Sequence, residues 1–298
     1  MARIPTALTR MLGVDYPIIG APMWQVSYEP LAIAVSRAGG LGCIASPNYP
    51  SSDALQIALE NIQQATDNPF GVNLHLSKKF DWKTQLKVCL DAGVKLFITA
   101  LGNPAEVIPD IHANGGIVLT GVVSLKHALD ACEKGVDGII AVGSGAGGHG
   151  GTISTMVFVP WLVEKTKIPV IAAGGISTGA QMVAALSLGA CGVVTGTRLV
   201  ATEEAGVIED YKKAVVEASP EDIEYTERIT GNFANWIRKS IKDFEGPADP
   251  RKTDWRRLWS AGQSVAQVDA ITPAETVIRE MVDGYWQALS KIPGVSWA

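Results

Sequence analysis

The sequence of 298 residues lacks clustered positive charge. Its 30 Asp and Glu residues outnumber its 25 Lys and Arg residues, which gives a formal net charge of −5, and no basic run occurs. Because nucleic-acid binding depends on clustered Lys and Arg, we expect no nucleic-acid partner. The sequence also lacks any stretch that approaches the roughly 20 apolar residues of a membrane span, and its N-terminal residues do not have the pattern of a signal peptide. We therefore expect a soluble, cytoplasmic protein with no membrane partner.

Cysteine is scarce as well. The four cysteines, Cys43, Cys89, Cys132 and Cys191, are scattered and form no C-x-x-C pair. Their spacing supports neither a disulfide framework nor a metal site, so we expect reduced, mostly buried side chains and no metal. Glycine, by contrast, is plentiful at 31 residues, and 47% of the chain is hydrophobic. This composition predicts a large core with many tight turns.

Short apolar segments rich in β-branched residues recur along the first two thirds of the chain. They are continuous rather than alternating, as expected for parallel strands that are covered on both faces. Between them lie segments with helical spacing and capping residues, such as 29–39, 52–65, 124–135 and 177–190. The eight predicted strands are 17–23, 40–45, 70–76, 94–100, 117–123, 137–143, 169–175 and 191–197.

Eight regular alternations of strand and helix favour an α/β fold, a closed TIM (β/α)8 barrel. A doubly wound sheet is the alternative, but the even count favours closure. We assign residues 1–205 to the barrel core. Residues 206–259, where charged and aromatic residues are interrupted by Pro and Gly, form a predicted helical insertion or lid after the eighth strand. Residues 260–298 form a C-terminal segment whose helix, 274–292, packs back on the barrel.

The segment GSGAGGHGG, residues 143–151, follows the sixth predicted strand and contains the spacing G-x-G-x-x-G. A dinucleotide-binding fingerprint needs a helix directly after this loop and an acid about twenty residues further on, at the end of the next strand. The residues before Thr155 are poor helix formers, and the candidate acid, Glu164, lies inside a predicted helix. We therefore interpret the loop as bare backbone against which a planar ring such as a flavin can lie, with His149 as its reactive group.

Other polar candidates stand at strand ends, where barrels of this kind place their active sites. The segments AAGGIS and TGTR follow strands seven and eight, and their glycine N–H groups and the hydroxyl of Thr197 suit a phosphate. Asn73 is an amide in an apolar strand, and its partner is either the edge of a flavin ring or another group of the barrel core. For His75 a structural and a functional role both stay open. His112 and His127 lie on helix patterns, and we expect them to face solvent.

Seven ordered motifs resemble the nitronate monooxygenase family, formerly called 2-nitropropane dioxygenases, over essentially the whole chain. They are YPIIGAPM, AGGLGCIAS, PFGVNLHL, AGGHGG, PVIAAGGIS, SLGACGVVTGTRLVATEEA and SAGQ. The resemblance implies a TIM barrel that binds FMN without a covalent bond. It also implies that the flavin is lined by Ala21, Pro22, Met23 and Asn73, with Gly148 packed near it. Its phosphate would be held by Gly174, Gly175, Gly196 and Thr197. Gln263 would approach the flavin or the substrate, and His149 would be the catalytic or substrate-orienting histidine.

The same resemblance implies a reaction, the oxidation of alkyl nitronates or nitroalkanes by dioxygen to a carbonyl compound and nitrite. The insertion, with Tyr225, Phe233 and Trp236, would cover the pocket. The family is similar to flavin-dependent enoyl-acyl-carrier-protein reductases and NADH:quinone reductases, so NAD(P)H-dependent reduction of an enoyl thioester or a quinone is the alternative. A third hypothesis is a protein that binds a flavin but catalyses no reaction. Whether the protein forms a homo-oligomer stays open. The chain departs from many relatives in carrying Gly145 where they have a glutamate, and GAPM where they have QGGM.

Overall fold

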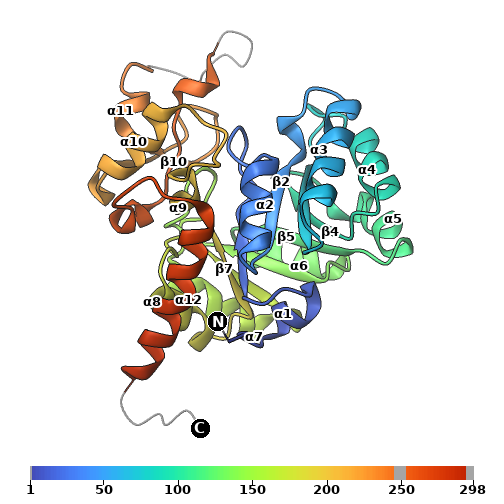
Figure 1. Cartoon of the computed structure of the whole chain (residues 1–298), viewed down its shortest axis with the longest axis horizontal. Helices are drawn as coiled ribbons and strands as arrows, with labels where there is room; N and C mark the ends of the chain where they lie inside the picture. Colours follow the sequence, from blue (N-terminus) through green and yellow to red (C-terminus); the bar gives the residue numbers. More distant parts are fainter. Residues whose placement is uncertain (1, 245–252, 293–298) are drawn as a thin grey trace.

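Eight parallel strands form a barrel in the computed structural model, which describes residues 2–244 and 253–292 (Figure 1). The sheet order is β1-β8-β7-β6-β5-β4-β3-β2. A bridge between Ile19 and Leu41 joins β1 to β2 and closes the ring, with the Gly20 N–H donating to the Leu41 carbonyl at 2.9 Å. The barrel is therefore confirmed, and the doubly wound alternative is wrong. The strands are β1 Ile18–Gly20, β2 Gly42–Ala45, β3 Phe70–His75, β4 Leu96–Ala100, β5 Ile117–Val122, β6 Gly138–Val142, β7 Val170–Ala173 and β8 Gly192–Thr195.

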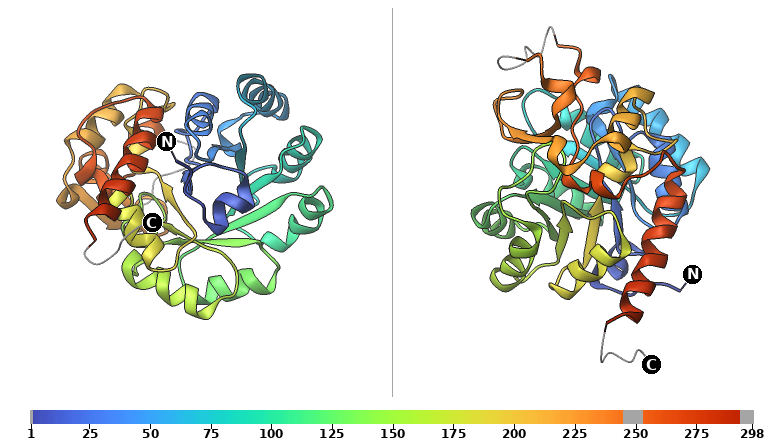
Figure 2. Two further views of the ribbon diagram at one scale, coloured as in Figure 1. Left: turned by 60° about the horizontal axis from the view of Figure 1, so that its bottom comes forward. Right: turned by 90° about the vertical axis from the view of Figure 1, so that its left-hand side faces the viewer.

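Helices surround the strands, and the left view of Figure 2 shows them outside the ring. The four helices predicted between the strands are confirmed, with small shifts at their ends. Their starts follow capping residues, such as Ser51, whose side chain accepts from the N–H of Ala54. The helices of the barrel are α1 Ala7–Leu12, α2 Glu29–Arg37, α3 Ser52–Ala65, α4 Trp82–Asp91, α5 Ile108–Ala113, α6 Leu125–Glu133, α7 Thr155–Lys165, α8 Gly179–Ser187 and α9 Thr197–Val200.

Apolar side chains fill two separate layers. One lies between the strands and the surrounding helices. The other fills the interior of the barrel, where Leu41, Ile98 and Ile171 are packed together and Leu8 and Leu12 of α1 join them. Figure 1 shows α1 at one end of the barrel, so this helix plugs the amino ends of the strands. The opposite, carboxyl end is left for a site.

The segment after β8 lies at the end of the barrel opposite α1 (Figure 1). Besides α10 Glu209–Glu217 and α11 Arg238–Ile241, it contains an antiparallel hairpin of β9 Ile223–Thr226 and β10 Ala234–Ile237. The expectation of helices alone was therefore wrong. β-Branched and aromatic residues favour strands here, and Gly231, with φ of +75°, supplies a turn conformation that few other residues adopt.

The last described helix, α12 Ala274–Ser290, packs along α8, as the right view of Figure 2 shows. Gly179 and Gly284 allow this close approach, because a Cβ at Gly179 would lie 2.2 Å from the carbonyl carbon of Gly284. Of the helices described here, none combines the length and the apolar character needed to cross a membrane. Each of the predicted segments 1–205, 206–259 and 260–298 includes residues that lie outside the described part of the chain, namely 1, 245–252 and 293–298.

Candidate active site

The inward-facing positions of the barrel become small at its carboxyl end. Because side chains alternate along a strand, the register that pairs Ala45 with Asn73 and His75 with Ala100 places all four inside the barrel. Ile98, the register partner of Asn73, also points inward. Large side chains fill the lower layers, whereas the top carries mostly alanine and glycine. Gly121 is exposed although it lies within β5. This end of the barrel, the barrel mouth, is therefore lined mainly by small side chains.

The loop after β7 has the features of a phosphate cradle. Gly174 and Gly175 have φ of +99° and +76°. A Cβ at Gly174 would lie 2.9 Å from the backbone N of Ala146, whereas one at Gly175 would meet nothing within 4 Å. Ser177, two residues on, has a buried hydroxyl without a hydrogen-bond partner in the described chain. Open glycine backbone and an unpaired donor just before helix α8 fit a phosphate group.

The loop after β8 lies against the loop after β1. A Cβ at Gly196 would lie 3.3 Å from the Cβ of Ala21 and 3.6 Å from the Sδ of Met23. The Oγ1 of the buried Thr197 accepts from the N–H of Gly262 at 2.9 Å, and this bond leaves its hydroxyl proton to donate. The structure thus brings the predicted residues of the loops after β1 and β8 together, and Gly262 joins them.

The predicted residues Ala21, Pro22 and Met23 are half-buried at the start of this β1 loop. The hydroxyl of Ser27 fixes their backbone, because it donates to the carbonyl of Ala21 at 2.8 Å and accepts from the N–H of Met23 at 3.0 Å. The Asn48 amide adds a bond to the carbonyl of Met23 at 3.3 Å. The segment is therefore held in one shape at the barrel mouth.

Most glycines of the 143–151 loop meet other parts of the chain. A Cβ at Gly147 would lie 2.9 Å from the carbonyl carbon of Ala261, and one at Gly145 would lie 3.2 Å from the N of Gly175. A side chain in place of Gly145 would thus push the phosphate cradle by a few tenths of an ångström. Gly148 differs, with φ of +67° and no atom closer than 3.9 Å to its Cβ position. It is the place in this loop where a ring has room beside bare backbone.

The predicted Gln263 also contacts this loop. Its N–H donates to the carbonyl of Gly145 at 3.1 Å, and its side chain is exposed. The segment SAGQ, residues 260–263, therefore lies along the glycine loop with its backbone in contact. This contact uses the backbone of Gln263 and not its side-chain amide.

Asn235 of β10 fastens the hairpin to the glycine loop, although it is not among the residues predicted from the sequence. It forms an antiparallel bridge with Gly148, with N–H···O distances of 2.9 and 3.2 Å. Its buried amide donates to the carbonyls of Ser144 at 2.9 Å and Ala146 at 2.6 Å. The signal was an amide within an apolar strand, the same signal that singled out Asn73.

His149 lies at the edge of the barrel mouth beside the hairpin. Its Nε2 is 3.2 Å from Oγ1 of Thr230, whose hydroxyl donates to the carbonyl of Asn232 at 3.0 Å. Because that hydroxyl proton is already used, Thr230 accepts, Nε2 carries the proton and Nδ1 stays free to take one. The imidazole is exposed at its edge, yet the surrounding atoms desolvate it and hold its pKa below the ordinary value of 6.5. His149 is therefore suited to act as a base near neutral pH.

The other polar candidates divide between the barrel interior and its outer wall. The amide nitrogen of Asn73 donates to the carbonyl of Ile98 at 2.9 Å, which is the bond within the barrel core considered above, while its Oδ1 is left for another partner. His75 lies inside the mouth close enough to His149 for a charge on one to lower the pKa of the other. His112 and His127 are exposed on α5 and α6, as predicted.

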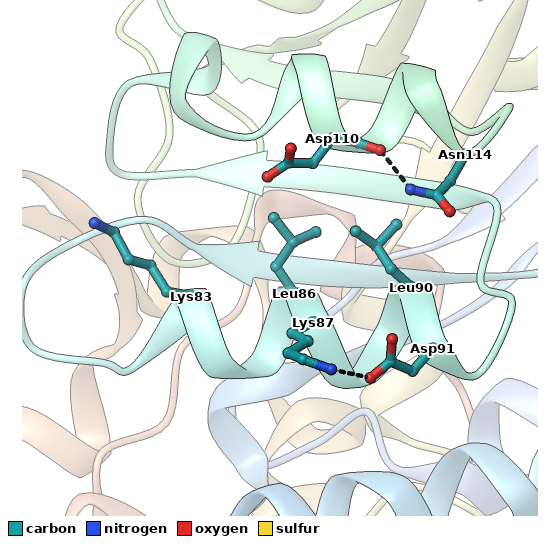
Figure 3. Close-up of a pocket in the computed structure, with 7 residues that line it drawn as sticks. All are labelled: Lys83, Leu86, Lys87, Leu90, Asp91, Asp110 and Asn114. Carbon is teal, nitrogen blue, oxygen red and sulfur yellow. Dashed lines mark hydrogen bonds and ion pairs between the residues drawn. The ribbon is translucent and has the colours of Figure 1, made fainter.

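A hollow of about 360 Å³ lies elsewhere, between α4 and α5 on the outer wall (Figure 3). It is lined by a mixture of charged and apolar side chains, among them the ion pair of Lys87 and Asp91. It contains no residue from a strand end and no histidine. Within residues 2–244 and 253–292, no group of three His, Cys, Asp or Glu side chains is placed to hold a metal ion. The features that suit chemistry are therefore those of the barrel mouth.

Replacing Asn235 by alanine is expected to destabilise the protein by about 1–3 kcal/mol, because the carbonyls of Ser144 and Ala146 lose their buried donor. The melting temperature should fall by several degrees, as thermal unfolding would measure. Asn232→Ala, on the exposed tip of the same hairpin, is the matched control and should change it little. Equal melting temperatures for both variants would show that Asn235 does not hold the loop.

Comparison with known proteins agrees with this geometry. The sequence matches the Nitronate monooxygenase family over residues 5–81 and 77–245. A probable nitronate monooxygenase of Staphylococcus saprophyticus is 30% identical, with 93% of this chain and 98% of that protein aligned. An indene-carboxyl-CoA dehydrogenase of Rhodococcus jostii is 32% identical over 78% of this chain. The aligned part corresponds to 65% of the length of that relative. The solved structure of FabK from Thermotoga maritima has a TM-score of 0.88 and 33% identity and covers 98% of this chain and 99% of its own.

Proposed function

The chain belongs to the nitronate monooxygenase family and is an oxidoreductase, and on this basis we propose that it uses FMN to oxidise alkyl nitronates with dioxygen to a carbonyl compound and nitrite. The observation that carries the proposal is the meeting of a free histidine base and a glycine cradle at one end of the barrel. Both lie at the carboxyl ends of the strands, where this fold carries out its chemistry.

The residues of the mouth fit FMN. Gly174, Gly175 and Ser177 would hold its phosphate at the start of α8, with Gly196 and Thr197 on the neighbouring strand end. The ring would lie over the small side chains of the barrel mouth, against Ala21, Pro22, Met23, Asn73 and Gly148, with Gln263 reaching toward the ring or the substrate.

FMN, when bound, would supply the electron transfer from the substrate to dioxygen. The protein's own part is proton transfer and orientation. Nδ1 of His149 would take the α-proton of a neutral nitroalkane and, once it carries that proton, donate it in a hydrogen bond to a nitro oxygen of the nitronate that forms. The lowered pKa keeps this imidazole neutral, and thus able to accept a proton, in neutral solution.

The hairpin would cover the reacting groups and exclude water. The Tyr225 hydroxyl donates to the carbonyl of Gly150 at 3.2 Å, and the rings of Tyr225 and Phe233 stack at 5.1 Å. Trp236 is buried in the hairpin's own apolar cluster with Ile229, so it supports this cover and does not face the mouth.

A second candidate is the NAD(P)H-dependent reduction of an enoyl thioester or a quinone. The similarity to a CoA dehydrogenase favours it, because that relative's substrate is a CoA thioester. The alignment with that relative covers 78% of this chain. Small organic substrates are common to both candidates, and the electron donor distinguishes them.

An anaerobic titration of the purified, flavin-loaded protein would test the proposal. A nitronate should bleach the visible flavin absorbance within the time of turnover, and admitting air should restore the colour and release nitrite. Rapid bleaching by NADH or NADPH, with no response to the nitronate, would overturn the proposal in favour of the second candidate. Bleaching by neither would indicate a flavin-binding protein without either activity.

A further inference from the structure

His75 is a second histidine of the barrel mouth, and the proposed function leaves it without a role. It is the last residue of β3, and its register partner is the small Ala100 of β4. The alternation along β3 points it into the barrel, two residues above Asn73. It therefore lies at the same barrel mouth as His149.

The ring of His75 is held in a defined orientation and tautomer. Its Nδ1 accepts from the N–H of Ser77 at 3.4 Å, and the ring of Phe80 lies against it with centroids 4.7 Å apart. Because Nδ1 provides a lone pair, the neutral imidazole carries its proton on Nε2. His75 thus offers a fixed donor, whereas the free nitrogen of His149 is an acceptor.

Partial burial, with a smaller effect of nearby charges, favours the neutral form of His75. Partial burial lowers its pKa from the ordinary 6.5, and the nearby Lys79 and His149 lower it further. Lys78 and Lys79 are exposed beside it on the loop that follows β3. A neutral donor next to lysine side chains favours an anionic or strongly polar oxygen at this side of the mouth.

We propose that His75 is a substrate-binding residue that donates its Nε2 proton to an oxygen of the substrate's nitro or nitronate group, while His149 takes the α-proton when the substrate is a neutral nitroalkane. The inference rests on the proposed function and adds the residue that recognises the anionic head group. Because it concerns one hydrogen bond to a charged group, it predicts a change in substrate affinity larger than the change in kcat.

The test compares His75→Leu, which removes the donor, with His75→Gln, which keeps an N–H donor on a chain of similar length. For His75→Leu, the KM for a nitronate should rise about 10- to 100-fold, with kcat within about threefold and flavin content unchanged. His75→Gln should stay within about threefold of the wild type. His127→Leu, at an exposed histidine on α6, is the matched control and should change nothing.

A second readout does not depend on turnover. Nitrate, a planar anion that cannot be oxidised, should bind near the flavin, perturb its absorbance spectrum, and lose affinity in His75→Leu by a similar factor. Unchanged nitrate affinity and KM in His75→Leu, or an equal loss in His75→Gln, would overturn the assignment. Failure of the proposed function has a different signature, because the wild-type flavin would then show no bleaching by any nitronate.

Discussion

Replacing His149 by alanine is expected to lower kcat/KM for a neutral nitroalkane by about 10²- to 10⁴-fold, the range that positioned general bases contribute. The variant loses Nδ1, which is the nitrogen that can accept a proton because Nε2 donates its own to Thr230. For a preformed nitronate the loss should be smaller, since its α-proton has already left. Steady-state kinetics with the two substrate forms measure the difference, and the visible spectrum should show that FMN stays bound.

The pH dependence provides a control for this assignment. A base works in its neutral form, so turnover of the nitroalkane should fall as the pH drops through the lowered pKa of His149, below 6.5, and be level above it. His149→Ala should lose this acid limb, whereas Thr230→Val, which removes only the acceptor of Nε2, should keep it. An alanine variant with unchanged kinetics, or with the same acid limb, would show that another group is the base.

The barrel is predictable from the sequence because each of its strands and many of its helices carry their own local signal. All four residues of β2 and all four of β7 are buried, which agrees with their continuous apolar runs. Helix α3 spans the residues 52–65 that its spacing predicts, although its N-cap is Ser51, one residue before the predicted Ser/Asp start. The count of eight such units then selects closure, since the topology follows from the order of the elements.

The arrangement of the site is less predictable because it depends on contacts between distant residues. Asn235 and the carbonyl of Ser144 are 91 residues apart. The glycine loop shows the same limit. Gly147 lets the backbone of Ala261 pack against the loop, and Gly145 lets the backbone of Gly175 do so. The sequence alone predicts that every glycine of this loop leaves space for a flavin ring. Only the packed chain shows that Gly148 has that room and that its neighbours accommodate the protein itself.

Replacing Gly175 by aspartate is expected to weaken FMN binding by roughly 10²-fold. The Cβ position at Gly175 faces open space, so the new side chain fits without a clash and points its charge into the cradle. Two unit charges about 5 Å apart, at an effective dielectric constant of about 20, repel by about 3 kcal/mol, which corresponds to that loss of affinity. The quenching of flavin fluorescence on binding to the apoprotein measures the dissociation constant.

Gly175→Asn is the matched control, because asparagine has nearly the shape of aspartate and both tolerate the positive φ of +76° at this position. Both variants therefore share the backbone strain and any steric effect, and their apoproteins should melt at similar temperatures. The charge alone distinguishes them, so the aspartate variant should bind FMN far more weakly than the asparagine variant, and the difference should shrink at high ionic strength. Equal FMN affinities in the two variants would show that the phosphate lies elsewhere than beside Gly175.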